Sequence, residues 1–104
     1  CGIDIQIQSD KVAAIQNKFL SAQEICTSMD QLHVLWSAKE SIYKAYGEKR
    51  IDFKRDIFIQ IDDIHRNFGT FTGELINHQE TLKYQLYYEI WKQYYLVCAI
   101  RMQD

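Results

Sequence analysis

Apolar and polar residues alternate at the start of the chain. Ile3, Ile5 and Ile7 are separated by polar residues, which is the period of a β-strand with one face in a core. We expect the isoleucine face to be the buried one. Asp4, between the first two isoleucines, is then expected to point away from that core.

Helical spacing dominates the next part of the chain. The longest helix is predicted to run from Asp30, its expected N-cap, to Tyr46, with Gly47 as the C-terminal stop. Before it, a short helix is expected within residues 12–19. A further helical turn is expected after a capping box at residues 21–24.

Beyond the long helix the period returns to two. Strands are predicted around Ile57, Ile59 and Ile61 and over residues 70–76, 83–91 and 94–102, with short connections at 77–80 and 92–93. The order of one strand, several helices and then strands indicates an α+β fold, a mostly antiparallel sheet with helices packed on one face. A chain of 104 residues suits a single domain spanning residues 1–104.

Charge and composition narrow the classes of function. Twelve basic and 14 acidic residues give a formal net charge of −2, without the strongly basic field typical of nucleic-acid binders. No apolar stretch approaches the ~20 residues that cross a bilayer, and no signal-peptide pattern is present. We therefore expect a cytoplasmic protein that binds neither nucleic acid nor membrane. The three cysteines lack metal-binding spacing and are expected to be thiols without a disulfide.

The long helix carries the candidate chemistry. Trp36, Glu40 and Lys44 recur every four residues and would stack along one helix face. Asp4 and Glu40 would supply two carboxylates from separate elements, which suits Mg²⁺ with its few protein ligands. Lys44 shares the Glu40 face, whereas Lys39 projects ~100° around the helix and is placed at the edge of the site. On spacing alone, a surface Glu40–Lys44 ion pair and a solvated Asp4 explain the pattern as well.

Three segments in order resemble motifs of the 4′-phosphopantetheinyl transferases. They are Gly2-Ile3-Asp4-Ile5, F-L-S-A-Q-E at residues 19–24 and W-S-A-K-E-S-I-Y-K at residues 36–44. The third is the most specific, and a looser resemblance through residues 94–99 extends it over essentially the whole chain. The resemblance implies transfer of the 4′-phosphopantetheine arm from coenzyme A to a serine of an acyl or peptidyl carrier protein, with release of 3′,5′-ADP.

The resemblance also implies roles for individual residues. Asp4 and Glu40 would ligate Mg²⁺ on the coenzyme A pyrophosphate, and Lys44 would contact phosphate and help to deprotonate the serine. Lys39 would be an auxiliary phosphate or substrate contact. Many surfactin-type members have a glutamate, as a third metal ligand, where this chain has Gln6. A neutral amide can coordinate the metal or hold a metal-bound water.

A partner is implied as well. Surfactin-type enzymes are pseudodimers of two similar halves, with coenzyme A in the cleft between them. This chain starts almost at the aspartate of the second half and contains no Ser-His pair, a motif that the first half supplies. We expect it to be the C-terminal half of such a pseudodimer, working with a second homologous half in the same polypeptide or another subunit. The competing hypothesis is a non-catalytic module that binds a carrier protein or coenzyme A through a degenerate or incomplete site.

Overall fold

The computed structural model describes residues 1–47, 49–62, 64–77 and 80–103. Within these residues one five-stranded antiparallel sheet has the order β1-β5-β4-β3-β2. Its strands are β1 (Gly2–Ile7), β2 (Ile57–Gln60), β3 (Phe68–Ile76), β4 (Thr81–Trp91) and β5 (Tyr94–Arg101). The helices are α1 (Asp10–Ala14), α2 (Gln16–Phe19), α3 (Met29–Ala45) and α4 (Phe53–Asp56).

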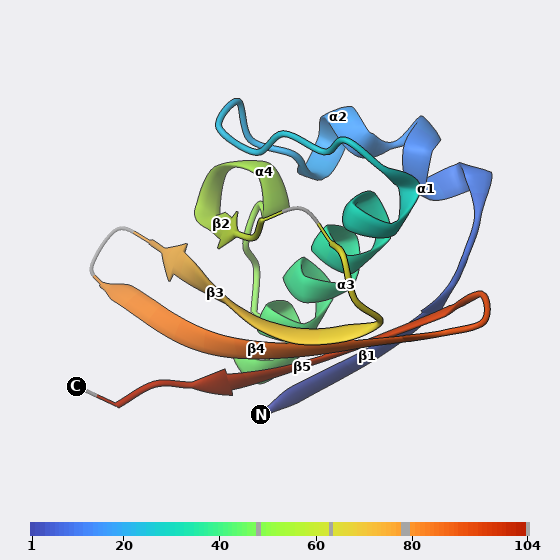
Figure 1. Ribbon diagram of the computed structural model, residues 1–104. Helices are drawn as coiled ribbons and strands as arrows, with labels where there is room; N and C mark the ends of the chain where they lie inside the picture. The colour runs from blue at the N-terminus through green and yellow to red at the C-terminus, as the bar shows by residue number, and fades with distance from the viewer. Residues whose placement is uncertain (48, 63, 78–79, 104) are drawn as a thin grey trace.

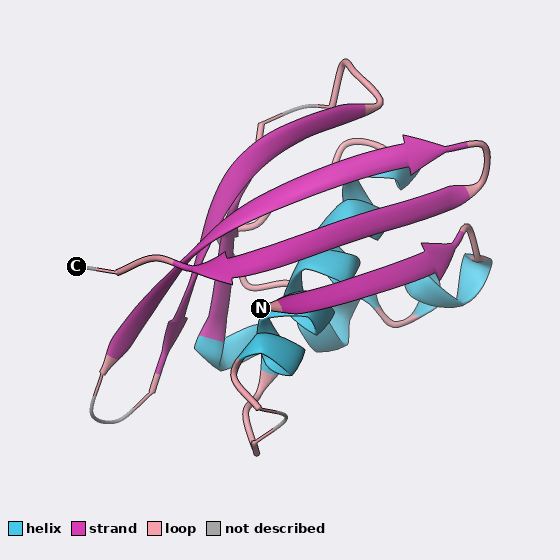
Figure 2. Ribbon diagram, turned by 90° about the horizontal axis from the view of Figure 1, so that it is seen from below, coloured by secondary structure: helices cyan, strands magenta, loops and turns pink. Residues whose placement is uncertain are grey.

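All four of these helices lie on one face of the sheet, with α3 against it (Figure 1). Seen from below, the strands lie in front of the helices and no described helix covers the near face (Figure 2). The predicted α+β fold, with helices on one face of an antiparallel sheet, is therefore confirmed. Within the described residues no helix is both long enough and apolar enough to cross a membrane.

The central helix α3 begins one residue earlier than predicted. Ser28 caps it, because the Ser28 hydroxyl accepts a hydrogen bond from the Gln31 amide at 3.1 Å. Asp30, the predicted cap, instead accepts a hydrogen bond from the Tyr95 hydroxyl at 2.6 Å. Burial and the neighbouring Asp30 raise the pKa of Tyr95, which keeps that hydroxyl a donor. Gly47 has a φ of 96°, as expected for a residue that ends a helix.

The apolar core fills the space between α3 and the sheet. Among its most buried side chains are Val34, Leu35, Ala38, Ile42, Ile57, Leu75, Leu86, Val97 and Ala99. These positions come from one stripe of the helix and from alternate positions along the strands, as the two periodicities predict. The core thus fixes which face of α3 meets the sheet.

The shorter helices differ from the prediction. The segment expected as one helix over residues 12–19 is divided at Ile15 into α1 and α2. The predicted capping contact at residues 21–24 does form, with the Ser21 amide donating to Glu24 Oε1 at 2.8 Å, but no helix follows among residues 20–28. The sequence pattern also missed α4, whose first turn is capped by the Asp52 carboxylate.

The predicted strands are present with shifted ends. Strand β2 stops at Gln60, so Ile61 lies beyond it, and β3 starts two residues earlier than predicted. The two-residue turn at 92–93 joins β4 to β5, with Lys92 at a φ of 55°. Residues 78 and 79 of the predicted connection 77–80 lie outside the described residues.

The facing predicted for β1 is wrong. Asp4 is only 3% exposed and faces α3, whereas Ile3, Ile5 and Ile7 are 53–61% exposed on the uncovered face. The alternation itself was predicted correctly. A period of two shows that the faces of a strand differ, but the tertiary packing decides which of them a helix covers.

Gly2 shows why α3 packs on the Asp4 face. A Cβ at Gly2 would lie 2.7 Å from the Ala45 backbone nitrogen and would clash with the Ser41 carbonyl oxygen. Only a residue without a side chain permits so close an approach between β1 and α3. The approach brings the next residue on that face, Asp4, directly against the helix.

Candidate active site

The Asp4 carboxylate is the centre of the candidate site. Its Oδ2 accepts hydrogen bonds from Ser37 Oγ at 2.5 Å and from Gln6 Nε2 at 2.9 Å. Its Oδ1 lies 2.9 Å from Lys44 Nζ, which also donates to the Ile3 carbonyl oxygen at 3.3 Å. A buried carboxylate needs such partners, because an unpaired charge away from water is strongly destabilising.

Helix α3 brings a polar row to this carboxylate. Ser37, Ser41 and Lys44 are spaced by four and three residues, so they share the side of α3 that meets β1 and β5. Ser41 Oγ lies 2.9 Å from the Val97 carbonyl oxygen on β5. Since Ser37 and Lys44 both contact Asp4, the half-buried Glu40 between them lies on the same edge of the helix. The structure therefore brings Asp4, Gln6 and Lys44 into contact, with Glu40 beside them.

Sequence reasoning did not single out Ser37 and Ser41 as parts of this arrangement. Each hydroxyl sits on a face that is otherwise buried, and both are 0% exposed. The signal was present in the sequence as two serines in register with Lys44 on one side of an apolar helix. It could be interpreted only after β1 was known to lie against that side.

Trp36 faces a different part of the molecule. Its ring centroid lies 4.9 Å from that of Phe19 and 5.7 Å from that of Phe53. Trp36 therefore packs against α2 and α4 rather than lining the Asp4 site.

Lys39 is not near Asp4 in this structure. Its side chain is 0% exposed, and its ammonium nitrogen lies 2.7 Å from Glu24 Oε1. Two backbone carbonyl oxygens, of Phe19 at 2.5 Å and Phe53 at 2.8 Å, complete its surroundings. Burial lowers the pKa of the ammonium, while the hydrogen bond and charge of Glu24 act to raise it. The sequence analysis placed Lys39 at the edge of the site, whereas the structure buries it beside Glu24.

The donor set fits a hard divalent cation held by few protein ligands. Among the described residues no cluster of three or more His, Cys, Asp or Glu side chains occurs. Asp4 and Glu40 are carboxylates on adjoining elements and Gln6 is an amide beside Asp4, and oxygen donors of these types could hold Mg²⁺, which keeps much of its water and uses substrate phosphates as ligands. The Lys44 ammonium already shows that a cation can reach Asp4 Oδ1 from a partly exposed position.

The protein is thus an α+β domain in which β1 and α3 bring carboxylates and a lysine together where the strand packs against the helix. A family model described as the 4′-phosphopantetheinyl transferase superfamily matches residues 1–100. The chain therefore belongs to the 4′-phosphopantetheinyl transferase superfamily, as its three motifs predicted. Membership implies phosphopantetheinyl transfer in general, with coenzyme A and a carrier protein as substrates. Comparison with curated proteins gives no match.

Proposed function

We propose that the protein transfers the 4′-phosphopantetheine arm of coenzyme A to a serine of an acyl or peptidyl carrier protein in a Mg²⁺-dependent reaction. The observation that carries the proposal is the contact between Asp4 of the first motif and Lys44 of the third, at 2.9 Å. Two motifs far apart in the sequence, one on β1 and one on α3, thus meet at the Asp4 carboxylate. The proposed setting is the cytoplasm.

Asp4 and Glu40 are the proposed metal ligands, with the Gln6 amide oxygen as a third, neutral ligand or as an acceptor for a metal-bound water. Gln6 Nε2 donates to Asp4 Oδ2, so the amide oxygen of Gln6 is the atom proposed for that role. When bound, Mg²⁺ neutralises charge on the pyrophosphate and stabilises the 3′,5′-ADP leaving group.

Lys44 and Glu40 are the proposed catalytic residues. The Lys44 side chain is 39% exposed, so its ammonium can reach a bound phosphate while its stem packs beside β1. In the proposed reaction Lys44 binds a phosphate oxygen of coenzyme A and assists removal of the proton from the attacking serine. Positioning of the two substrates supplies much of the remaining rate enhancement. The proposal gives Lys39 no direct phosphate contact, because burial separates it from the surface.

A second homologous half is part of the proposal, in the same polypeptide or in another subunit. The face of the sheet opposite the helices is largely apolar, and no helix of the described residues covers it. The strand register places its side chains in rows, Ile7–Tyr94–Trp91, Ile5–Leu96–Glu89–Phe68 and Ile3–Cys98–Tyr87–Thr70. Several are highly exposed, including Ile5 at 61%, Trp91 at 62% and Phe68 at 64%.

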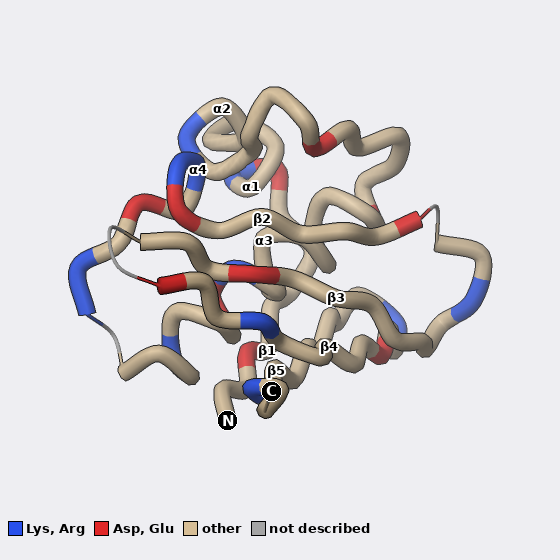
Figure 3. Tube along the Cα trace, turned by 90° about the vertical axis from the view of Figure 1, so that its left-hand side faces the viewer, with Lys and Arg blue, Asp and Glu red and all other residues tan. Residues whose placement is uncertain are grey.

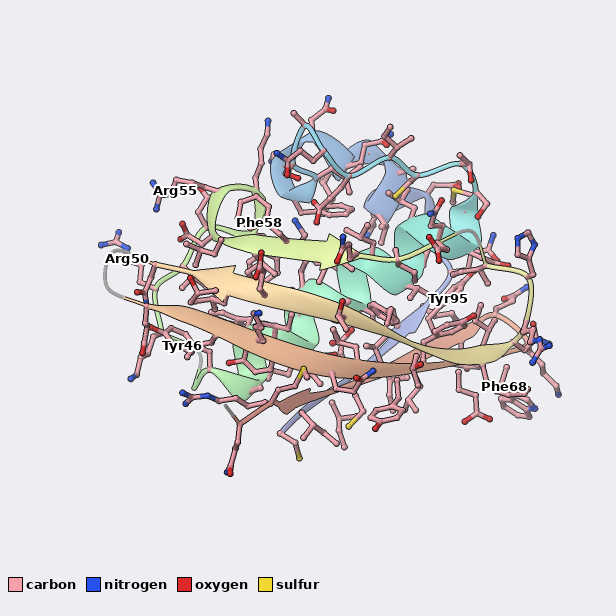
Figure 4. The ribbon with its side chains drawn as sticks, turned by 60° about the vertical axis from the view of Figure 1, so that its left-hand side comes forward. Tyr46, Arg50, Arg55, Phe58, Phe68 and Tyr95 are labelled. Carbon is pink, nitrogen blue, oxygen red and sulfur yellow. The ribbon has the colours of Figure 1, made fainter. Side chains whose placement is uncertain are left out.

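Contiguous apolar surface of this kind is typical of interaction sites. Figure 4 shows Phe68 on the uncovered side of the sheet and Tyr95 on the side that the helices cover. Ile5, Trp91, Tyr94, Leu96 and Glu89 also line a hollow of about 550 Å³ on that uncovered side. Cover by a matching half would bury the isoleucines of β1. The same strand carries Asp4 on its opposite face.

The test is the mass of a carrier protein after incubation with coenzyme A, Mg²⁺ and the full-length protein. Transfer adds one phosphopantetheine group to the carrier, and chelation of Mg²⁺ is expected to prevent it. Glu40→Gln removes one metal-binding charge and is expected to lower the rate by at least 100-fold. Lys11→Met, at an exposed position on α1, is the matched control and should leave the rate unchanged.

The competing function is a binding module without transferase activity. Neutral Gln6 in place of a carboxylate is the observation that favours it. If the full-length protein modifies none of several carriers, yet binds coenzyme A or a carrier, the binding module is the correct interpretation. If Glu40→Gln transfers at the wild-type rate, the metal role of Glu40 is wrong.

A further inference from the structure

We propose that Lys39 and Glu24 form a buried clamp that sets the rotation of α3 about its axis, and that Lys39 is therefore a positioning residue for Glu40 and Lys44. The inference rests on the proposed function, since it concerns how the transfer site is held. It assigns to Lys39 a role different from the phosphate contact that the motif resemblance implied.

The hydrogen-bonding capacity of Lys39 is fully used inside the protein. An ammonium group has three N–H donors and no acceptor. Three acceptors lie within 2.8 Å of Lys39 Nζ: Glu24 Oε1, the Phe19 carbonyl oxygen and the Phe53 carbonyl oxygen. With its side chain 0% exposed, Lys39 has neither a spare donor nor a path to a phosphate at the surface.

Glu24 joins the same ammonium to two further segments. Its Oε1 also accepts from the Ser21 amide at 2.8 Å, and its Oε2 accepts from the Ile59 amide of β2 at 2.7 Å. The Glu24 side chain is 3% exposed. One ion pair thus connects α3, the end of α2, the 21–24 turn, the start of α4 and the edge strand β2. Glu24 Oε2 thus pairs the Ile59 backbone N–H, a donor on the edge strand of the sheet.

Aromatic contacts strengthen the same connections. Phe19 and Phe53, whose carbonyl oxygens bind Lys39, pack their rings against Trp36, and Phe53 also packs against Tyr43 at 5.5 Å. Trp36, Lys39 and Tyr43 lie three and four residues apart and so share one side of α3. The neighbouring α4 carries two basic residues followed by an acidic one (Figure 3), and there Arg55 Nε donates to Asp56 Oδ1 at 3.0 Å.

Rotation of α3 links this clamp to the site. Successive residues in a helix differ by ~100°, so a helix held through Lys39 directs the next residue, Glu40, towards a defined edge. Lys44 lies on the side of α3 that meets β1, roughly opposite Lys39. A small rotation at the clamp would move both groups relative to Asp4, and misplacement by about 1 Å can cost about 100-fold in rate.

The experiment compares Lys39→Met, Lys39→Met/Glu24→Gln and the surface control Lys11→Met in the full-length protein. Steady-state kinetics of carrier modification give kcat and the KM for coenzyme A, while hydrogen exchange and the melting temperature report on the clamp. For Lys39→Met we expect kcat to fall about 10- to 100-fold with KM for coenzyme A changed less than about 3-fold. Faster exchange is expected at the Ser21 and Ile59 amides.

The double variant separates positioning from ligand binding. Lys39→Met leaves the Glu24 charge buried without its cation, and Glu24→Gln removes that charge. We therefore expect the double variant to be at least about 5-fold more active than Lys39→Met, which loss of a phosphate contact could not produce. If Lys39→Met fails to fold, recovery of fold and transfer in the double variant supports the clamp.

Two results would overturn the role of Lys39. One is a rise of about 10-fold or more in the KM for coenzyme A with unchanged kcat and no recovery in the double variant. The other is unchanged exchange at Ile59 together with an unchanged melting temperature in Lys39→Met. Absence of transfer by the wild-type protein would overturn the proposed function, while exchange and melting would still decide on the clamp.

Discussion

Lys44 Nζ lies 2.9 Å from Asp4 Oδ1, although the two residues are 40 positions apart in the chain. The lysine is partly exposed and the aspartate is buried. A cation of the protein itself thus occupies one oxygen of the carboxylate proposed to bind Mg²⁺. Metal and lysine would compete for that oxygen until a substrate phosphate offers Lys44 another partner.

This competition predicts the effect of Lys44→Met on metal binding. Without coenzyme A, Mg²⁺ affinity measured by calorimetry should rise about 2- to 5-fold, the scale of a partly exposed ion pair. Carrier modification should fall at the same time, because the phosphate contact and the assistance of Lys44 in removing the serine proton are lost. Lys11→Met is the control for both measurements. Weaker Mg²⁺ binding in Lys44→Met would contradict the competition.

The close approach of β1 to α3 predicts that Gly2→Ala is destabilising. A methyl group there meets backbone atoms of Ser41 and Ala45, which cannot rotate away. We expect a loss of about 1–3 kcal/mol in the free energy of unfolding, measured by urea denaturation. Gly69→Ala is the matched control, since the three heavy atoms nearest to its Cβ would all belong to the Tyr88 side chain and none to the backbone. Equal losses in the two variants would argue against the special role of Gly2.

The uncovered sheet face predicts a substitution that impairs function without unfolding the domain. Ile5 is 61% exposed, so Ile5→Lys should change the free energy of unfolding of this domain by no more than about 0.5 kcal/mol. If a second half covers that face, a buried lysine should loosen the cleft and raise the KM for coenzyme A. Ile25→Lys is the control, because Ile25 is 76% exposed in the 20–28 loop. Equal KM values for both variants would mean that the face is not an interface.

Cys26 is predicted to react slowly with alkylating reagents. Burial and the nearby Glu24 raise the pKa of its thiol from 9.0 to about 11. At pH 8 about 0.1% of such a thiol is thiolate, so alkylation should be roughly 100-fold slower than for an ordinary cysteine and should accelerate as the pH rises towards 11. Peptide mass mapping after iodoacetamide treatment distinguishes it from the exposed Cys1. Labelling of both at one rate would show that Cys26 is not protected.

The chain order and the periodicities were enough to predict the fold class. Local backbone geometry alone places every second residue of a strand on the same face, and every third or fourth residue of a helix on the same face. Such patterns located the long helix, its stop at Gly47, the turn at residues 92–93 and most of the strands. The motif order also led directly to the superfamily. Element ends were less predictable, because the cap at Ser28 and the break at Ile15 depend on individual backbone contacts.

The sequence by itself therefore determined which side chains belong to one face of each element. Only the tertiary structure decided what each face meets. Asp4 is buried because Gly2 admits α3 on that side, and Lys39 is buried because three segments supply its acceptors. Both outcomes depend on residues distant in the chain, and free energies of burial and ion pairing arise only when those residues come together.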